Sequence, residues 1–139
     1  MSKHMNITYS FDERNIEELH ELYQNEWWTK GRSLQETRRV VAGSQINIGV
    51  LNSDKALVGY ARVLTDFTFK ALIFDIIVSK DHRGKGLGKK LVTLIKTHEK
   101  LVSVKSFELY CLPEMFSFYE NLGFSTKVAG IKLMRCSHE

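Results

Sequence analysis

The spacing of apolar residues near the start of the chain predicts a short strand followed by a helix. Asn6–Tyr9 is expected to form the strand. Either Asp12 or Asn15 then begins the helix, because apolar side chains return every three or four positions after them. These apolar positions are Ile16, Leu19, Leu22, Tyr23 and Trp27.

A second helix is predicted from Ser33. Ser33 and Glu36 have the spacing of a capping box, in which each side chain satisfies a free backbone N–H of the other. Gly43 is expected to end this helix, because glycine readily adopts the backbone conformation that follows a last turn.

After Gly43 the period of the apolar positions becomes strand-like. Ile46–Leu51 and Ala56–Leu64 are predicted to form a hairpin, joined by a turn at residues 52–55. The next segment, Ala71–Val78, is almost continuously apolar. Such a run is typical of a central strand that is covered on both faces.

The second half of the chain alternates between helix and strand. We expect a long helix from about Gly86 to Leu101, a strand over Ser106–Cys111 and a short helix over Glu114–Leu122. Phe124–Arg135 is expected to form one or two closing strands. This order predicts a mixed α/β sandwich with an antiparallel half and one parallel crossover.

Composition is that of one folded domain spanning residues 1–139. The chain has a mass of 16.1 kDa and is 43% hydrophobic, and it contains a single proline, Pro113. No apolar run approaches the roughly 18 residues of a membrane span. Met1–Met5 lacks the apolar stretch of a secretory signal. Two readings of residues 1–4 stay open: Met5 is an alternative start, or the leading residues are a cloning remnant.

The two cysteines, Cys111 and Cys136, are too few for a disulfide framework, and no cysteine–histidine cluster has zinc spacing. We therefore expect a cytoplasmic protein without a metal. The net charge of +4 and the pI near 9.1 fit an anionic ligand.

Candidate chemistry concentrates between the predicted central strand and the helix after it. Glycines alternate with other residues at Gly84, Gly86 and Gly88, and basic residues flank them at Arg83, Lys85, Lys89 and Lys90. Glycine allows backbone N–H groups to approach a bulky anion, and the helix start adds partial positive charge. Together these features predict a pyrophosphate cradle rather than a solvated basic turn.

Two common nucleotide motifs do not fit this loop. A Walker A loop needs Ser or Thr after Gly-Lys, and here Lys90 follows Gly88-Lys89. The dinucleotide fingerprint wants a third small residue where this chain has Lys89.

Two motifs resemble the GNAT superfamily of N-acetyltransferases, which bind acetyl-coenzyme A. Arg83–Gly88 matches the family's Gln/Arg-x-x-Gly-x-Gly/Ala signature, and Phe118–Phe124 resembles its Phe-Tyr-x-x-x-Gly-Phe signature. The resemblance extends over nearly the whole chain. It implies a GNAT-like mixed, mostly antiparallel sheet that is flanked by helices on both faces and has a splayed central parallel strand pair.

The resemblance also implies roles for individual residues. The backbone of Ile76, Ile77 and Val78 would pair with the pantetheine arm, and one N–H there would stabilise the oxyanion of the tetrahedral intermediate. Tyr119 would be the catalytic residue that protonates the departing thiolate. The remaining cofactor-binding candidates are Arg83, Gly84, Lys85, Gly86, Leu87, Gly88, Lys89 and Phe118.

The group that accepts the amine proton stays open. Candidates are Asp75, Glu108, Asp66, Glu26 or water. Neither cysteine lies in a motif that would make it a nucleophile, which favours direct transfer in a ternary complex.

An acceptor pocket is expected between the first two helices and the hairpin. Tyr60 and Arg62 of the returning hairpin strand would line it, together with the connection that holds Trp27 and Trp28. Because consecutive helical residues face different directions, one tryptophan is expected in the core and the other at the surface.

These observations predict an acetyl-CoA-dependent N-acetyltransferase that acts on a primary amine of a small molecule or a peptide. A homodimer is compatible with the resemblance, whereas no membrane or nucleic-acid partner is expected. The alternatives are a non-catalytic acyl-CoA-binding module of the same fold and, below it, a nucleic-acid-binding protein.

Overall fold

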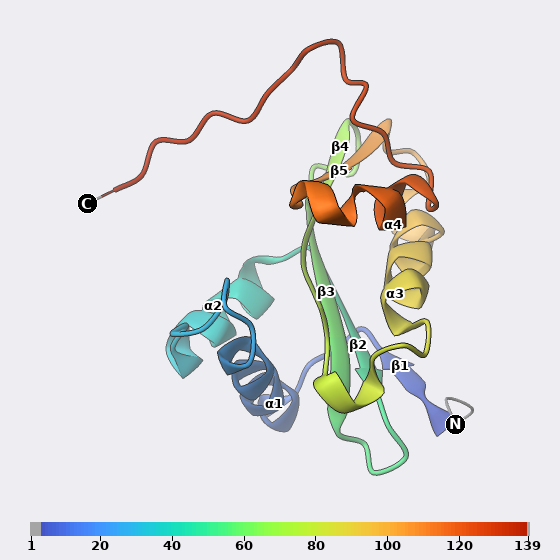
Figure 1. Cartoon of the computed structure of the whole chain (residues 1–139). Coiled ribbons are helices and arrows are strands. Elements are labelled where there is room, and N and C mark those ends of the chain that lie inside the picture. Colours follow the sequence, from blue (N-terminus) through green and yellow to red (C-terminus); the bar gives the residue numbers. More distant parts are fainter. Residues whose placement is uncertain (1–3, 139) are drawn as a thin grey trace.

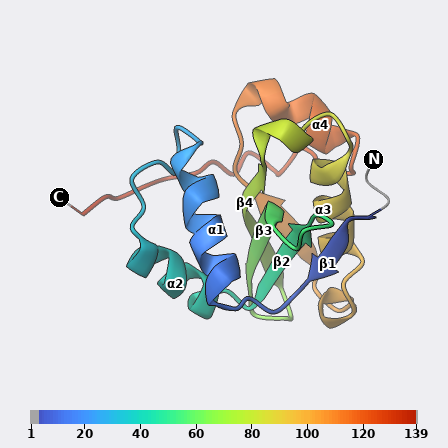
Figure 2. The ribbon, with the colours of Figure 1, turned by 90° about the horizontal axis from the view of Figure 1, so that it is seen from below.

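The computed structural model describes residues 4–138, so Met1–Lys3, part of the expectation about the chain start, lies outside the described residues. A twisted sheet forms the centre of the molecule, and helices cover both of its faces (Figures 1 and 2). Helices α1 (Glu13–Gln24) and α2 (Leu34–Gly43) lie on one face, and α3 (Leu87–Lys96) lies on the other. Within the described residues, no helix is long and apolar enough to cross a membrane.

The sheet has five strands in the order in which they occur in the chain. The first four strands pair antiparallel, and the last pair, β4–β5, is parallel. This arrangement confirms the predicted mixed, mostly antiparallel sheet. The strands are β1 (Asn6–Thr8), β2 (Ile46–Leu51), β3 (Leu57–Thr65), β4 (Lys70–Val78) and β5 (Ser106–Leu109).

Both N-terminal helices begin at capping boxes. Asp12 and Asn15 exchange side-chain and backbone hydrogen bonds at the start of α1, so the two predicted starting residues act together. Ser33 and Glu36 do the same at the start of α2, as their spacing predicts.

Each face of the sheet has its own apolar core. On one face Leu91 and Ile95 of α3 are completely buried against the strands. On the other face Leu19 of α1 packs with Tyr60 and Ile77. Strand β4 is therefore covered on both sides, as its apolar run predicts.

Two predicted helices are shorter than expected. Helix α3 ends at Lys96 rather than near Leu101, because His98 accepts a hydrogen bond from the Lys100 N–H and caps a separate 3-10 turn over Glu99–Leu101. The last helix, α4, covers only Phe116–Glu120, after a 3-10 turn over Pro113–Met115.

The prediction of closing strands over Phe124–Arg135 is wrong. Residues 124–135 form no strand, because the segment pairs with none of the five strands, although the outer edge of β5 is open to it. A tight turn over Val128–Ile131 bends it instead, and the rest leads away from the body (Figures 1 and 2). Strand β5 is consequently the last strand, and the parallel pair lies at an edge of the sheet rather than at its centre.

A bulge interrupts the pairing of β3 with β4. Tyr60 pairs with Ile77, whereas Arg62 pairs with Phe74, so two steps along β3 correspond to three along β4. Asp75 lies in this bulge with a φ of 56°. A residue other than glycine seldom adopts this left-handed conformation.

The carboxylate of Asp75 lies at the centre of a buried polar cluster. Its Oδ2 accepts hydrogen bonds from Tyr23 Oη at 2.8 Å, from Arg32 Nη1 at 2.7 Å and from Arg62 Nε at 2.7 Å. Burial raises the pKa of Asp75, but the hydrogen bonds from Arg32 and Arg62 outweigh it, and the pKa lies below its ordinary value of 3.8. The cluster joins α1, the α1–α2 connection and strands β3 and β4.

We predict that Asp75→Asn destabilises the protein strongly at neutral pH. The variant leaves Arg32 and Arg62 without their counter-charge, a loss of about 3–5 kcal/mol for a broken buried pair. Folding lowers the pKa of Asp75 below 3.8. The stability that its ionised carboxylate gives to the folded state is therefore complete above pH 3.8 and disappears as the pH falls through the pKa of the folded state. Urea unfolding at pH 7 and at low pH measures the difference.

A matched control is Glu13→Gln, which removes the surface partner of Arg38. An exposed ion pair contributes little, so this variant should unfold like the parent chain. Equal stability of Asp75→Asn and the parent at pH 7 would contradict the structural role of the cluster.

Candidate functional site

Strands β4 and β5 part halfway along β4. Their pairing runs from Lys70 with Ser106 to Ile73 with Leu109 and stops there, directly before the bulge at Asp75. The rest of β4, Phe74–Val78, has no partner strand on that edge among residues 4–138. Of the three predicted cofactor-binding residues in this stretch, Ile76 and Val78 face the free edge, whereas the backbone of Ile77 faces Tyr60 of β3. An extended ligand can join the free edge as an added strand.

The glycine-rich loop follows β4 and leads into α3. Gly84 and Gly86 have φ values of 76° and 78°, so other residues would be strained at both positions. A Cβ atom at either position would meet nothing within 4 Å. The loop therefore presents open backbone next to the first turn of α3.

The start of α3 differs from that of the other two long helices. Its cap is Gly86, which has no side chain to accept a hydrogen bond from the first turn. Leu87 is buried, and the N–H groups of the first turn are left for an external acceptor. A helix that begins at glycine, with no side chain bonded to the N–H groups of its first turn, is suited to hold a phosphate group.

The basic side chains of the loop serve different purposes. Arg83 is turned toward the protein: its Nη2 donates to Glu26 Oε2 at 2.6 Å and its Nε donates to the Val78 carbonyl at 3.1 Å. Lys85 and Lys89 are exposed beside the helix start. The two lysines, rather than the Arg83 side chain, are placed to attract an anion from solvent.

The two sequence motifs meet in space. A Cβ atom built on Gly88 would lie 3.5 Å from Cζ of Phe118. Helix α4 therefore packs onto the first turn of α3 through Phe118, although the two residues lie far apart in the sequence. This contact brings the neighbouring Tyr119 to the same region as the glycine loop.

Tyr119 is half-buried beside a groove that runs along β5. Its ring makes an edge-to-face contact with Phe124 at 5.9 Å between centroids. Burial, and secondarily the nearby Cys111, raises the pKa of Tyr119 to about 12. The phenol is thus protonated at neutral pH and can donate a proton.

Cys111 lies in the same groove but is a poor nucleophile. Burial raises the pKa of its thiol, which keeps the thiol protonated. The absence of a nucleophilic cysteine stays a prediction.

All four carboxylates considered as general bases are occupied. Asp75 is held by its two arginines, Glu26 pairs with Arg83, and Glu108 pairs with Lys70. Asp66 accepts hydrogen bonds from the backbone of its own turn, which lowers its pKa. Each would have to leave its partner before it could accept a proton.

Sequence reasoning missed Tyr23 and Arg32 as partners of Asp75. Tyr23 was expected in the apolar stripe of the first helix, and its buried hydroxyl needed a hydrogen-bond partner. The need for that partner is the sequence feature that could have pointed to a polar contact of Tyr23. Arg32 lies in a connection with no distinguishing pattern.

The predicted acceptor-side residues are placed differently from what was expected. Trp27 and Trp28 are 77% and 40% exposed, so the expectation that one of them lies in the core is wrong. They lie in the non-helical connection after α1, where helical spacing does not apply. Tyr60 is completely buried and donates to Asn47 Oδ1 at 2.5 Å, so it cannot line an open pocket.

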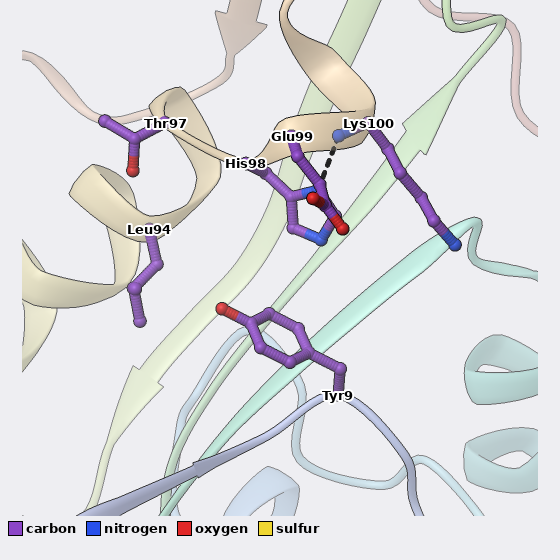
Figure 3. Close-up of a pocket in the computed structure, with 6 residues that line it drawn as sticks. All are labelled: Tyr9, Leu94, Thr97, His98, Glu99 and Lys100. Atoms are coloured by element: carbon purple, nitrogen blue, oxygen red, sulfur yellow. Dashed lines mark hydrogen bonds between the residues drawn. The ribbon is translucent and has the colours of Figure 1, made fainter.

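Another pocket, of about 470 Å³, lies near the far end of α3 (Figure 3). Tyr9 packs edge-to-face with His98 there, at 5.4 Å between ring centroids. Leu94 and Thr97, at the C-terminal end of α3, also line this pocket. It contains none of the candidate residues of the glycine loop or of α4.

Comparison with known proteins agrees with this geometry. Residues 44–126 match the family model of the acetyltransferase (GNAT) domain. An uncharacterized N-acetyltransferase ycf52 from Gracilaria tenuistipitata var. liui is 30% identical over 134 residues, covering 94% of this chain and 73% of that protein.

Solved structures have the same fold. A putative GNAT-family acetyltransferase from Xanthomonas campestris pv. campestris superposes with a TM-score of 0.84 at 25% identity, covering 97% of this chain and 94% of that one. The PaiA N-acetyltransferase from Thermoplasma acidophilum, solved in complex with coenzyme A, has a TM-score of 0.72 at 19% identity, covering 87% and 89%.

The matched region contains β4, the glycine loop, α3 and α4, which are the elements that build the site. The family match agrees with the open start of α3 and with the separation of β4 from β5. The chain therefore belongs to the GNAT acetyltransferase family.

Proposed function

We propose that this GNAT chain transfers the acetyl group of acetyl-CoA directly to a primary amine of a small molecule or a peptide. The observation that carries the proposal is the free edge of β4, which leads into the glycine loop and the uncapped start of α3. Helix α4, which carries Tyr119, packs on the first turn of α3 through Phe118.

The residues of this chain fit acetyl-CoA without a metal ion. The open backbone at Gly84 and Gly86 and the first turn of α3 would hold the pyrophosphate, with Lys85 and Lys89 adding charge. The free edge of β4 at Ile76 and Val78 would pair with the pantetheine arm, because the backbone of Ile77 faces its partner Tyr60 on β3. The Thermoplasma acidophilum protein, which has the same fold and was solved in complex with coenzyme A, supports binding of this coenzyme but not the individual residues.

In the reaction, the amine nitrogen attacks the thioester carbonyl carbon. A backbone N–H of Ile76–Val78 would stabilise the oxyanion, the C–S bond then breaks, and Tyr119 protonates the departing thiolate. The ammonium proton leaves through water, since the candidate carboxylates are held in other contacts.

The proposal is tested by incubating the chain with acetyl-CoA and a panel of amines and measuring thiol release. Release that depends on the amine supports acetyl transfer. Tight acetyl-CoA binding without thiol release for any amine would instead make the chain a non-catalytic acyl-CoA-binding module. The ion pairs that hold the candidate carboxylates favour this alternative, because they leave no free general base among those carboxylates.

Gly86→Glu should abolish acetyl-CoA binding while the fold survives. The new side chain would fill the open space beside the start of α3 and repel the phosphates. Isothermal titration calorimetry measures the affinity, and circular dichroism checks the fold.

Gly31→Glu is the matched control for this prediction. Gly31 also has a positive φ, 99°, and open space around it, so the variant carries the same kind of backbone strain and the same charge. It should bind acetyl-CoA like the parent. Unchanged affinity of a folded Gly86→Glu would remove the loop from the site.

Tyr119→Phe should leave acetyl-CoA affinity nearly unchanged, because only a hydroxyl is lost. We expect kcat to fall by roughly 10²-fold or more, the usual size of a lost general acid. Steady-state kinetics and thermal melting on the same sample measure both effects. Tyr9→Phe, at an exposed tyrosine away from the β5 groove, should have full kcat. A stable Tyr119→Phe with full kcat would show that water protonates the thiolate.

A further inference from the structure

The cluster around Asp75 holds more positive than negative charge. The guanidinium groups of Arg32 and Arg62 share its single carboxylate. Tyr23 adds no negative charge, because burial raises the pKa of its phenol and the hydroxyl donates to Asp75 Oδ2. Arginine side chains stay protonated in proteins. The cluster therefore has one positive charge in excess.

No second carboxylate balances this charge. Among residues 4–138, neither arginine of the cluster forms an ion pair with a carboxylate other than Asp75. The charge of Arg32 contributes to the lowered pKa of Glu36, but Glu36 is exposed and its carboxylate accepts the Ser33 N–H at 2.8 Å. Solvent screens an exposed charge of this kind. The excess charge of the cluster is therefore available to an external anion.

The excess charge reaches the surface at the two arginines. Their side chains are 29% and 13% exposed for Arg32 and Arg62, against 4% for Asp75. Arg32 Nε and Arg62 Nη2 make no hydrogen bond to residues 4–138. Within the same residues no buried side-chain nitrogen or oxygen lacks a partner, so these two donors face solvent. Guanidinium N–H groups bind the paired oxygens of a carboxylate or a phosphate.

The cluster lies beside the opening between β4 and β5. The Arg62 guanidinium lies over the ring of Phe74 at 5.0 Å, and Phe74 contacts Tyr110 edge-to-face at 5.7 Å. Tyr110 directly follows β5, where the pairing with β4 has ended. Asp75 is followed by Ile76, which faces the free edge of β4. The arginines are thus placed on the α1–α2 side of that opening, opposite α3 (Figure 1).

The phosphates of the coenzyme would lie at the other end of the free edge. With the pyrophosphate at the glycine loop, the pantetheine arm runs back along Val78 and then Ile76, so the thioester lies toward Asp75. Because Asp75 and Ile76 are adjacent in the chain, the two guanidinium groups lie within roughly 10 Å of the Ile76 backbone. One small molecule can span that distance.

We infer that Arg32 and Arg62 bind an anionic group of the acceptor, which is therefore a small molecule that carries a carboxylate or a phosphate besides its primary amine. The anion balances the excess charge of the cluster and leaves the amine end free to reach the thioester. A second cationic group at this position would be repelled, which disfavours polyamines. The assignment to the acceptor rests on the proposed function, whereas the anion site itself does not.

The anion site is tested by nuclear magnetic resonance of the parent chain. The Nε–H signals of ¹⁵N-labelled arginines are followed while acetate or phosphate replaces chloride at constant ionic strength. We expect a saturable shift of the Arg32 signal, which is identified by its loss in Arg32→Met. Arg38, an exposed arginine of α2 paired with Glu13, is the control in the same spectrum and should not shift in this way. An unmoved Arg32 signal, or equal shifts of both, would overturn the inference.

The acceptor class is tested with three amines that share an aminoethyl group. Ethanolamine, β-alanine and phosphoethanolamine end in a hydroxyl, a carboxylate and a phosphate, and thiol release from acetyl-CoA is measured with each. At least one anionic amine should have a kcat/KM about 10-fold or more above that of ethanolamine, the size of a charge-assisted hydrogen bond. The better anionic amine identifies the group that the arginines bind. Equal or better use of ethanolamine would overturn the inference.

Arg32→Met should bring the ratio of the two kcat/KM values close to one. Asp75 keeps Arg62 and Tyr23 as partners in this variant, so the cluster becomes neutral and should still fold, which circular dichroism checks. Arg38→Met is the matched control and should keep the ratio of the parent. An unchanged ratio in Arg32→Met would show that Arg32 only supports the fold, because a structural defect slows both amines alike.

Failure of this inference and failure of the proposed function give different results. Thiol release with ethanolamine alone would uphold acetyl transfer and overturn the anionic acceptor. No release with any amine would contradict the proposed function and with it the acceptor role, while the shift of the Arg32 signal would still decide whether the arginines bind an anion.

Discussion

The ion cluster around Asp75 is the interaction on which the arrangement of the site depends. A carboxylate that is only 8% exposed is tolerable because two guanidinium groups and a phenol satisfy it. The cluster holds a non-glycine residue at a φ of 56° and so holds the bulge in β4. Beyond that bulge β4 no longer runs beside β5, and its backbone edge becomes available to a ligand.

The three long helices use their first turns in different ways. Helices α1 and α2 satisfy their own N–H groups with the boxes at Asp12 and Ser33, each worth about 1 kcal/mol. Helix α3 begins instead at Gly86 and forgoes this stabilisation. The chain thus keeps one helix start open, and it does so beside the free edge of β4 and the exposed Lys85 and Lys89.

Several positively charged side chains of this chain are held in ion pairs within the protein. Arg32 and Arg62 share the buried Asp75, and Arg83 ties the glycine loop to Glu26 of the α1–α2 connection. This last ion pair joins the glycine loop to a residue 57 positions earlier in the sequence. It also explains why a motif residue expected to bind phosphate presents its backbone rather than its side chain.

Local sequence determined the capping boxes, the left-handed glycines and the order of strands and helices, because each depends on hydrogen bonds or φ preferences within a few residues. The family motifs at Arg83 and Phe118 likewise followed from short patterns. Only the tertiary structure decided the partners of Asp75, the contact of Phe118 with Gly88 and the exposure of both tryptophans. It also decided that residues 124–135 form no strand, although their alternation favours one. A strand exists only when a second strand satisfies its backbone, and that partner is set by the path of the whole chain rather than by the segment itself.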